Sequence, residues 1–234
     1  MPDFTDFEKK IKVNFKNKDL LKEAFTHRSY LNENPSWNLD HNERLEFLGD
    51  AVLELVVTEY LFKAFPNKPE GELTSFRAAL VNANMLAEIS QEIDINDYLL
   101  LSRGEAKDVG RARQYILANT MEALIGAIYL DRGYAGAEDF ITRIILPHID
   151  EVISKKLFRD PKSLFQERAQ EIAGVTPSYS VLKEWGPDHN KHFVIGVYLG
   201  NELIAEGEGP SKQEAQANAA QIALEVKNWG HVER

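Results

Sequence analysis

Residues 41–54, with the sequence HNERLEFLGDAVLE, constrain the fold of this chain more than any other stretch. The segment contains no proline, and Asp40 in front of it can serve as an N-cap, so a helix is predicted that continues to about residue 65. At about 100° per residue, its side chains divide into two opposite faces. The apolar face holds Leu45, Leu48, Val52, Leu55 and Val56. The opposite face holds the carboxylates Glu43, Glu46, Asp50 and Glu54.

The row of carboxylates needs an explanation, because like charges three or four residues apart destabilise a helix. Solvent and salt can screen such a row. A divalent cation is the alternative, since hard ions such as Mg²⁺ take oxygen ligands from carboxylates and phosphates. The periodicity alone leaves both interpretations open.

The composition is that of a globular protein of one large or two modest domains, with 234 residues of which 44% are hydrophobic. No apolar run approaches the roughly 20 residues of a membrane span. The start of the chain, MPDFTDFEKKIKVNF, lacks the apolar region of a signal peptide. There is no cysteine, which excludes disulfides and thiolate metal sites. We therefore expect a cytoplasmic protein without membrane association.

The charge balance is acidic, with a net charge of −10. Residues 160–234 hold 7 Lys+Arg and 11 Asp+Glu, and the remainder holds 20 and 26. Neither part is basic overall, so any binding of nucleic acid must rely on local patches or on metal. Such binding should weaken at moderate salt.

The first two thirds of the chain have helical periodicity and no strand pattern. Besides the helix described above, helices are predicted over residues 6–18, 17–29, 75–93, 114–130 and 136–156, the last interrupted near Pro147. Residues 66–69 carry two prolines and end the first long helix. Residues 104–113 form a polar loop whose arginines are either solvated or available to phosphates.

The helix over residues 114–130, QYILANTMEALIGAIYL, carries a second polar pair, because Asn119 and Glu122 lie about one turn apart. Ala123 and Gly126 beside them are small enough to let another helix approach closely. If this helix packs against the first one, four oxygen-bearing side chains converge. Converging oxygen ligands on two rigid helices can hold Mg²⁺. A metal site is one outcome of that packing.

The hydrophobic pattern changes in the last third of the chain, after a short polar segment, FRDPKS, over residues 158–163. A helix over residues 164–173 is followed by alternating patterns typical of strands over residues 177–182, 192–199 and 201–208. A final helix is predicted over residues 211–227. The order is therefore α-β-β-β-α.

The contiguous string NERLEFLGDAV, together with FTHRSY and ILANTMEALIGAIYLD, resembles the ribonuclease III family of metal-dependent endonucleases that act on double-stranded RNA. The strings LFQERAQ, PSY, GPDHNKHF and GEGPSKQEAQANAA resemble, in order and spacing, the double-stranded-RNA-binding domain. The resemblance implies an all-α nuclease domain followed by a small α+β domain. The boundaries expected are 6–133 with a helical tail to about 157, a linker over 158–163, and an RNA-binding domain over 160–229.

The resemblance also implies a site. Glu46, Asp50 and Glu122 match acidic ligands of the family, with Asp50 and Glu122 as the catalytic residues. Together with Asn119 they form the expected metal set for Mg²⁺, with Mn²⁺ as a substitute, and no nucleotide cofactor is expected. Asn119 stands where the family has aspartate. An amide oxygen can bind a metal, but it lacks the negative charge and brings an NH₂ group.

Four further positions need an interpretation. Phe47 lies beside the acidic row and away from the apolar face; the family resemblance implies a homodimer in which it enters a socket on the partner, and the alternative is packing within its own chain. Glu70 matches another acidic residue near the family's active centre, or else it favours a helix dipole in a first turn. His27 and Tyr30, within FTHRSY, are interpreted as partly buried packing residues.

The resemblance places double-stranded RNA on the second domain, since duplex RNA is read through its minor grooves and phosphates. Gln166 and Glu167 are expected at one minor groove, and the loop with Pro187, Asp188 and His189 at the next. The phosphate-facing set at the start of the last helix is Ser211, Lys212, Gln213 and Gln216. Many relatives have two adjacent basic residues where this chain has Lys212 and Gln213, so we expect a shallower salt dependence than theirs. Each residue taken alone is equally typical of plain surface.

Three functions follow from these patterns. The first is a homodimeric, Mg²⁺-dependent endoribonuclease that matures rRNA, mRNA and tRNA precursors and leaves 5′-phosphate and 3′-hydroxyl ends. The second is a double-stranded-RNA-binding protein of the same fold, catalytically impaired by Asn119. The third is a structural component of a ribonucleoprotein, which the retention of Glu46, Asp50 and Glu122 disfavours.

Overall fold

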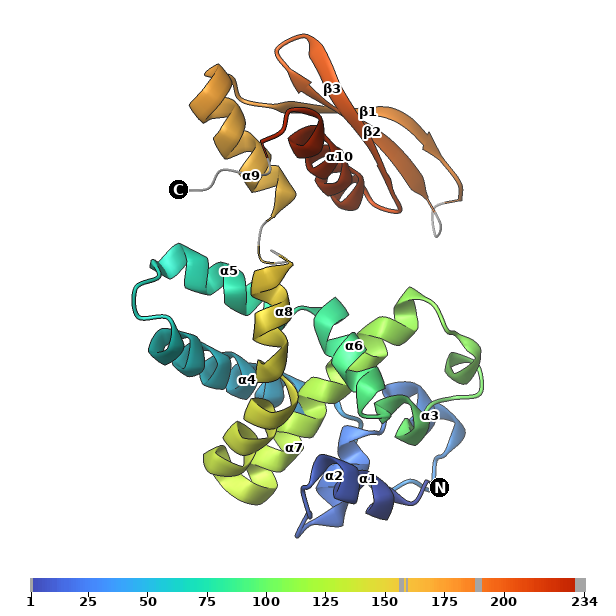
Figure 1. Ribbon diagram of the computed structural model, residues 1–234. Helices are drawn as coiled ribbons and strands as arrows, with labels where there is room; N and C mark the ends of the chain where they lie inside the picture. The colour runs from blue at the N-terminus through green and yellow to red at the C-terminus, as the bar shows by residue number, and fades with distance from the viewer. Residues whose placement is uncertain (1, 156–157, 159, 188–190, 230–234) are drawn as a thin grey trace. The chain divides into compact units, whose positions relative to one another are not determined.

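A computed structural model describes residues 2–155, 158, 160–187 and 191–229 of the chain (Figure 1). The chain divides into two compact units, Met1–Phe158 and Arg159–Arg234. The division falls within the segment predicted as a linker. Each unit has its own hydrophobic core and is described by itself.

The first unit is helical, as predicted. Its α-helices are α1 (Phe4–Ile11), α2 (Lys18–Ala24), α3 (Arg28–Glu33), α4 (Glu43–Ala64), α5 (Glu70–Leu80), α6 (Ala83–Glu92), α7 (Arg111–Ile144) and α8 (Ile149–Ser154). Short 3₁₀ turns lie at Ile95–Tyr98, Glu105–Lys107 and Leu146–His148. No strand ladder occurs among the described residues of this unit; Thr26 and Leu100 form an isolated bridge.

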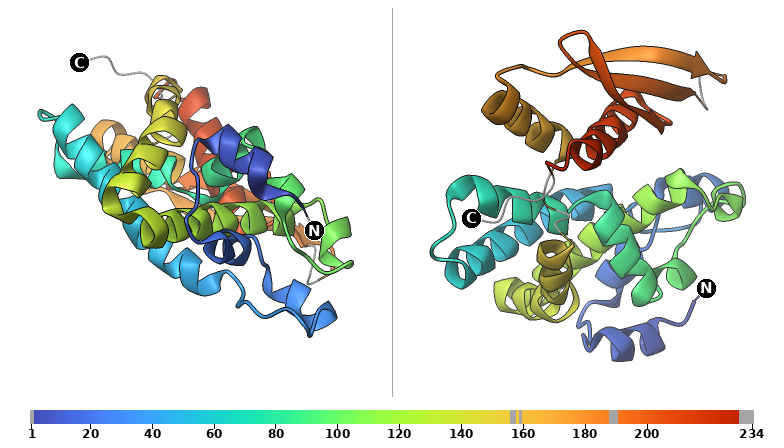
Figure 2. Two further views of the ribbon diagram at one scale, coloured as in Figure 1. Left: turned by 90° about the horizontal axis from the view of Figure 1, so that it is seen from below. Right: turned by 45° about the horizontal axis from the view of Figure 1, so that its top comes forward.

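Helices α4 and α7 pack along each other at the centre of this unit (Figures 1 and 2). The buried face of α4 includes Leu53 and Val57, so it is turned relative to the predicted apolar face. As a result the prediction for Leu55 is wrong, because its side chain is 56% exposed. The predicted N-cap is also wrong: Asn42, not Asp40, precedes the first turn.

The single helix predicted over residues 75–93 is two helices in the structure. Helix α5 begins earlier, at Glu70, directly after Pro69. The chain leaves the helical conformation at Asn82, whose side chain accepts a hydrogen bond from the Met85 backbone N–H and so caps α6. Apolar spacing continues across this break, which is why periodicity alone did not detect it.

The predicted helix over residues 17–29 is likewise two helices, α2 and α3. Asn17 caps α2 and His27 caps α3, each by accepting a hydrogen bond from a backbone N–H two residues later. Helix α1 is shorter than the predicted 6–18: it ends at Ile11 and is capped by Lys12, which has a φ of 56°.

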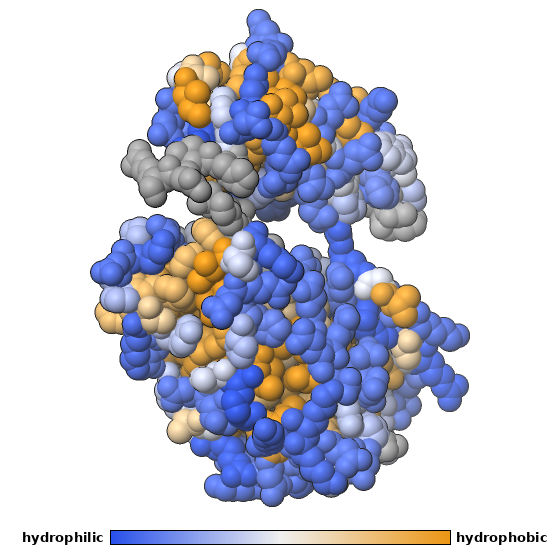
Figure 3. Space-filling model, viewed as in Figure 1, coloured by the Kyte–Doolittle hydropathy of each residue, from blue (hydrophilic) through white to orange (hydrophobic). Residues whose placement is uncertain are grey.

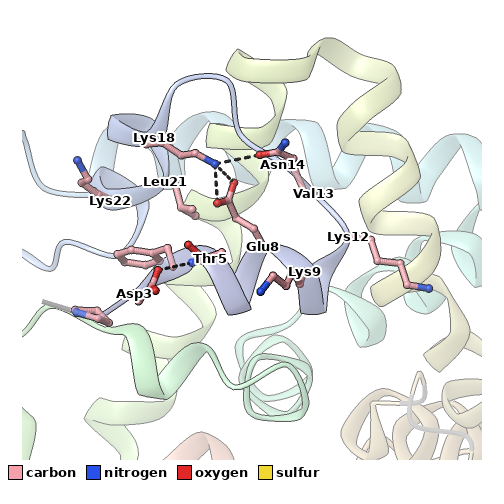
Figure 4. A pocket seen from close by; sticks show the side chains of 12 residues that line it. Asp3, Thr5, Glu8, Lys9, Lys12, Val13, Asn14, Lys18, Leu21 and Lys22 are labelled. Carbon is pink, nitrogen blue, oxygen red and sulfur yellow. Dashed lines mark hydrogen bonds and ion pairs between the residues drawn. The ribbon is translucent and has the colours of Figure 1, made fainter.

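The connection from α1 to α2 is fixed by Glu8, a buried carboxylate (Figure 4). Its Oε1 accepts from the Phe15 backbone N–H at 2.7 Å and from Lys18 Nζ at 2.6 Å. Lys18 Nζ also donates to the Asn14 side chain at 3.1 Å. The ion pair between Glu8 and Lys18 therefore connects α1 to the start of α2. It lies in a hollow beside α1 whose lining includes four lysines, Lys9, Lys12, Lys18 and Lys22.

Helix α7 is bent rather than continuous. Gly133 adopts φ 72° and ψ −175° inside it, a conformation that favours glycine. The bend separates the two helices predicted over residues 114–130 and 136–156. The second segment ends at Ile144, before the turn containing Pro147, and α8 follows.

The second unit has the predicted α-β-β-β-α order. Its elements are α9 (Pro161–Arg168) with a π turn at Ala169–Ala173, β1 (Ser178–Trp185), β2 (His192–Leu199), β3 (Glu202–Gly209) and α10 (Lys212–Val226). The sheet is antiparallel in the order β1-β2-β3. Helices α9 and α10 lie on one side of it, as Figure 2 shows on the right. Phe165 is buried there and stacks on Trp229 at 5.5 Å.

Across the described residues, no helix combines the length and the apolar character needed to cross a membrane.

Candidate active site

The site is built on a close crossing of α4 and α7. A Cβ added to Gly49 would overlap the carbonyl oxygen of Glu122 and lie 2.8 Å from the Gly126 backbone nitrogen. A Cβ added to Gly126 would in turn overlap the carbonyl oxygen of Leu45. The two backbones therefore touch directly, which only glycine permits at both positions. Gly126 was predicted to allow this close approach but Gly49 was not, although glycine inside a long helix is itself a signal.

This crossing brings together the side chains that the sequence predicted from two distant segments. Gly49 lies between Glu46 and Asp50 on α4, and Glu122 lies on α7 at the contact itself. Glu46, Asn119 and Glu122 are partly buried, whereas Asp50 is exposed. The arrangement concentrates negative charge where water is partly excluded.

The electrostatics of the site reflect this concentration. Burial, and then the charges of Asp50 and Glu46, raise the pKa of Glu122 to about 7. Burial and the neighbouring Glu43 raise the pKa of Glu46, and Asp50 adds to the same effect. Neighbouring carboxylates disfavour the charged forms of Glu46 and Glu122. A cation placed among these carboxylates would stabilise the charged forms.

Asn119 lies close enough to Glu46 for its side-chain amide to affect the pKa of that carboxylate. Its favourable interaction with the charged form acts to lower the pKa of Glu46. The neutral amide thus offsets part of the repulsion among the carboxylates. An aspartate at the same place has no donor and adds a further negative charge.

The donor chemistry of the four residues fits a hard divalent cation, since all four side chains offer oxygen. They come from rigid helices, and two of them are partly desolvated carboxylates. Among the described residues, no group of three or more His, Asp and Glu side chains is arranged so that it could hold an ion as it stands. The residues to hold Mg²⁺ would be Glu46, Asp50, Asn119 and Glu122.

A second structural feature of α4 is its exposed apolar face. Phe47 is 83% exposed and Phe62 is 72% exposed, and Leu55 lies on the same side of the helix. Phe47 therefore does not pack within its own chain. Beside it lies an open hollow of about 610 Å³, whose walls include Leu20, Leu48 and Leu130. Hydrophobic residues also show on the surface of this unit near α5 (Figure 3).

Other predicted positions have structural partners. His27 Nδ1 lies 2.8 Å from Ser29 Oγ, and burial lowers the pKa of His27. Tyr30 packs edge-on against Trp37 with ring centroids 5.4 Å apart. Both fit the packing interpretation.

The remaining candidates of the first unit have partners within their own segments. Glu70 lies in the first turn of α5, where its carboxylate accepts from Thr74 Oγ1 at 2.9 Å. Arg113 donates to the backbone carbonyl oxygens of Asp108 and Glu105 and so fixes the 104–113 loop. That contact disfavours Arg113 as a phosphate ligand.

On the second unit, the described candidates for RNA contact lie on its surface. Gln166, Glu167, Lys212 and Gln213 are exposed. Gln216 is partly buried and accepts a hydrogen bond from Lys162 Nζ at 2.7 Å. Lys212 lies at the start of α10, with its Nζ 5.6 Å from the centroid of the Phe193 ring. Asp188 and His189 lie outside the described residues.

Comparison with known proteins agrees with both units. Residues 17–149 match the family model described as Ribonuclease-III-like, and residues 161–227 match the double-stranded RNA binding motif. Ribonuclease 3 of Borreliella afzelii is 43% identical over 222 residues, which cover 95% of this chain and 90% of that protein. Ribonuclease 3 of Geobacillus sp. (strain WCH70) is 46% identical over 222 residues with the same coverage.

A solved structure agrees with the first unit. The nuclease domain of ribonuclease III from Campylobacter jejuni superimposes with a TM-score of 0.57 at 41% sequence identity. The match covers 62% of this chain and 97% of that chain. The description of that structure concerns flexibility in a region involved in dimer formation.

A helical nuclease domain with a carboxylate-lined helix crossing, followed by a double-stranded RNA binding motif, defines a class of two-domain endoribonucleases. The chain belongs to the ribonuclease III family.

Proposed function

We propose that this chain is a metal-dependent endoribonuclease that hydrolyses phosphodiester bonds of double-stranded RNA and leaves 5′-phosphate and 3′-hydroxyl ends. The observation that carries the proposal is the convergence of Glu46, Asp50 and Glu122 at the crossing of α4 and α7. Precursors of rRNA, mRNA and tRNA, which contain long duplex segments, are the proposed substrates.

In this proposal Asp50 and Glu122 are the catalytic residues, and Glu46 and Asn119 complete the metal set. Bound Mg²⁺, or Mn²⁺ in its place, supplies charge stabilisation for the phosphoryl oxygens and an activated water. The chain itself holds the ligands on two helices whose separation is fixed by Gly49 and Gly126. It also partly excludes water from Glu46 and Glu122, which strengthens electrostatic interactions with the phosphate.

We further propose that the chain acts as a homodimer through the exposed face of α4. Phe47 protrudes beside an apolar hollow on the same surface. A two-fold axis at this surface lets Phe47 of each copy enter the hollow of the other, as an isologous interface requires. Burial of two exposed phenylalanines per copy, Phe47 and Phe62, favours association.

The second unit is proposed to bind duplex RNA through Gln166, Glu167, His189, Lys212, Gln213 and Gln216. The N-terminus of α10 offers free backbone N–H groups to a phosphate, next to Lys212. With few basic residues on this surface, shape and hydroxyl contacts must contribute much of the affinity.

The enzyme proposal is tested with end-labelled duplex RNA incubated with Mg²⁺, with Ca²⁺ and with chelator. Staggered cuts are expected in the reaction with Mg²⁺ and not in the reactions with Ca²⁺ or chelator. Glu122→Gln is the matched control, because it keeps the size of the side chain and removes the charge; it should bind the duplex and fail to cut it. Duplex binding without cuts in any divalent metal would refute the enzyme proposal.

A second candidate function, a duplex-binding protein with impaired catalysis, is favoured by the amide at residue 119, which brings no negative charge to the proposed metal set. The same amide acts on the pKa of Glu46, another residue of that set. Asn119→Asp should then raise Mg²⁺-dependent cleavage by about tenfold or more, since ligand-shell changes alter activity on that scale. Equal cleavage by the two versions would show that residue 119 does not limit turnover.

A further inference from the structure

Helices α9 and α10 cover one face of the sheet of the second unit. Phe193, Ile195 and Val197 of β2 point toward the helices and form the core. The alternate residues Val194, Gly196 and Tyr198 therefore point to the opposite face. No described helix of this unit covers that face, which we call the outer sheet face.

An apolar strip runs along the centre of the outer sheet face. Leu182 of β1 and Leu203 of β3 reach over Gly196 from both sides: a Cβ on this glycine would lie 3.1 Å from Leu182 Cδ1 and 2.8 Å from Leu203 Cδ1. Tyr198 Cε2 lies at 3.1 Å from the same position. Leu182 is nonetheless 37% exposed and Leu203 is 43% exposed. Grouped exposed apolar side chains of this kind mark interaction sites.

The two edges of the same face carry opposite charges. Val194 pairs with Lys183 of β1 on one side and with Glu208 of β3 on the other. Lys183, Val194 and Glu208 thus form one row across the sheet. Glu206 follows on β3, opposite Gly196. On this face β1 carries the single charge of Lys183, β3 carries Glu206 and Glu208, and the apolar strip lies between them.

This pattern is complementary to itself. A two-fold rotation about an axis along β2, in the plane of contact, places β1 of one copy over β3 of the other. Because Lys183 and Glu208 belong to one row, the rotation places Lys183 of each copy opposite Glu208 of the other copy. We propose that the outer sheet face binds the same face of a second copy of this chain, with Lys183 facing the partner's Glu208. The contact is separate from the α4 surface and extends beyond the proposed function.

The size of the face sets the strength of this contact. Three strands of eight residues span about 26 by 14 Å, or roughly 360 Å² per copy, at standard strand spacings. Two such faces fall short of the roughly 1,200 Å² that stable interfaces bury. The association is therefore weak alone and gains from high local concentration, such as several copies along one duplex.

The chain contains no cysteine, so single cysteines report on this contact without background. Full-length Lys183→Cys and Glu208→Cys, one carrying a size tag, are mixed and oxidised. The mixture should form a disulfide-linked heterodimer at least about fivefold faster than either variant alone. Residues 183 and 208 of one copy are two strands apart, about 10 Å, which is too far for a disulfide within the chain.

Glu184→Cys is the matched control, because it neighbours Lys183 on β1 but pairs with the inward-facing Phe193. Mixed with Glu208→Cys, it should react no faster than the single variants. Repeating the reaction with Phe47→Asp in both chains separates this contact from the proposed α4 dimer, and the same heterodimer should form. The proposal is overturned if the 183–208 mixture reacts no faster than the 184–208 mixture, or if the single variants react equally fast.

Charge reversal provides a second measurement without a covalent bond. Lys183→Glu and Glu208→Lys each place like charges opposite one another, so each should weaken concentration-dependent association in sedimentation. The double reversal restores opposite charges and should restore association. A double variant as weak as the single ones contradicts the two-fold arrangement.

Discussion

Both units use glycine to bring backbones together, but they use the contact differently. In the first unit, Gly49 and Gly126 let α4 and α7 touch at the point where Glu122 lies. In the second, Gly207 faces α10, and a Cβ there would overlap the Ala219 backbone nitrogen. The first contact carries the ionisable groups of the site. The second only packs a helix on a sheet and leaves Lys212 and Gln213 on the outside.

The difference predicts how function and stability are coupled. In the first unit the carboxylates are part of the packed contact, so a change in packing displaces them and a change in charge alters stability. In the second unit the packed contact and the proposed RNA-binding surface are separate, so each can be altered without the other. The following predictions test this comparison, beginning with the largest expected effect.

Adding one methyl group at the glycine contacts should have the largest effect. Gly49→Ala should destabilise the first unit by about 3 kcal/mol or more, because the new Cβ meets backbone that cannot move aside, and cleavage should be lost with it. Gly207→Ala should destabilise the second unit by a similar amount and leave the melting of the first unchanged. Thermal unfolding followed by calorimetry and cleavage of duplex RNA measure both effects.

Gly71→Ala is the control for these substitutions, since nothing lies within 4 Å of a Cβ at that position of α5. It should stabilise the first unit by about 0.5–1 kcal/mol through helix propensity. A Gly49→Ala variant as stable as Gly71→Ala would contradict the close helix crossing.

The stability of the first unit should depend on pH through Glu122 when chelator is present. Its pKa is about 7 in the folded chain against an ordinary value of 4.5, so the folded state binds more protons between these two values. Unfolding free energy should therefore fall as pH rises from about 4.5 to 7, by roughly 1–2 kcal/mol after allowance for partial exposure. Denaturant unfolding at pH 5.5 and pH 8 measures the slope.

Glu122→Gln should remove most of this slope and make the chain more stable than the wild type at pH 8. Glu46, whose pKa is also raised, contributes in the same direction and accounts for a residual slope. An unchanged pH dependence in Glu122→Gln would show that Glu122 is ionised in the folded chain at neutral pH.

Lys212→Ala should have the smallest effect on the fold. It removes a cation–π contact with Phe193 at the surface, worth about 0.5–1 kcal/mol at most. Duplex RNA affinity should fall severalfold, and the slope of log K against log salt should decrease by about one. Binding measured from 50 to 300 mM salt checks both. An unaltered salt slope would remove Lys212 from the phosphate-facing set.

Much of the architecture was predictable because it rests on local pattern. Period-two alternation located the strands of the second unit, and helical periodicity located α4 and most of α7. The break at Asn82 was missed because its cap interrupts a continuous apolar spacing. Leu55 was assigned to the core because periodicity gives the direction of a face but not its centre, which packing against α7 determines.

The residues of the proposed site could be chosen from the sequence, but their interactions could not. Spacing placed Glu46 with Asp50 and Asn119 with Glu122, each pair on one helix. The effect of Asn119 on the pKa of Glu46 and the raised pKa of Glu122 arise between residues of two different helices. The tertiary contact at Gly49 brings these helices together.

The central claim is that carboxylates at this crossing hold the metal used for cleavage. Asp50→Cys tests it directly, because a thiolate binds Mg²⁺ poorly and binds Cd²⁺ or Mn²⁺ better, and the chain has no other cysteine. Cleavage of duplex RNA by Asp50→Cys should be lost with Mg²⁺ and partly restored when Cd²⁺ or Mn²⁺ is added. Glu54→Cys, one turn further along the same row, should cut with Mg²⁺ as the wild type does. Full Mg²⁺-dependent cleavage by Asp50→Cys would contradict the proposed site.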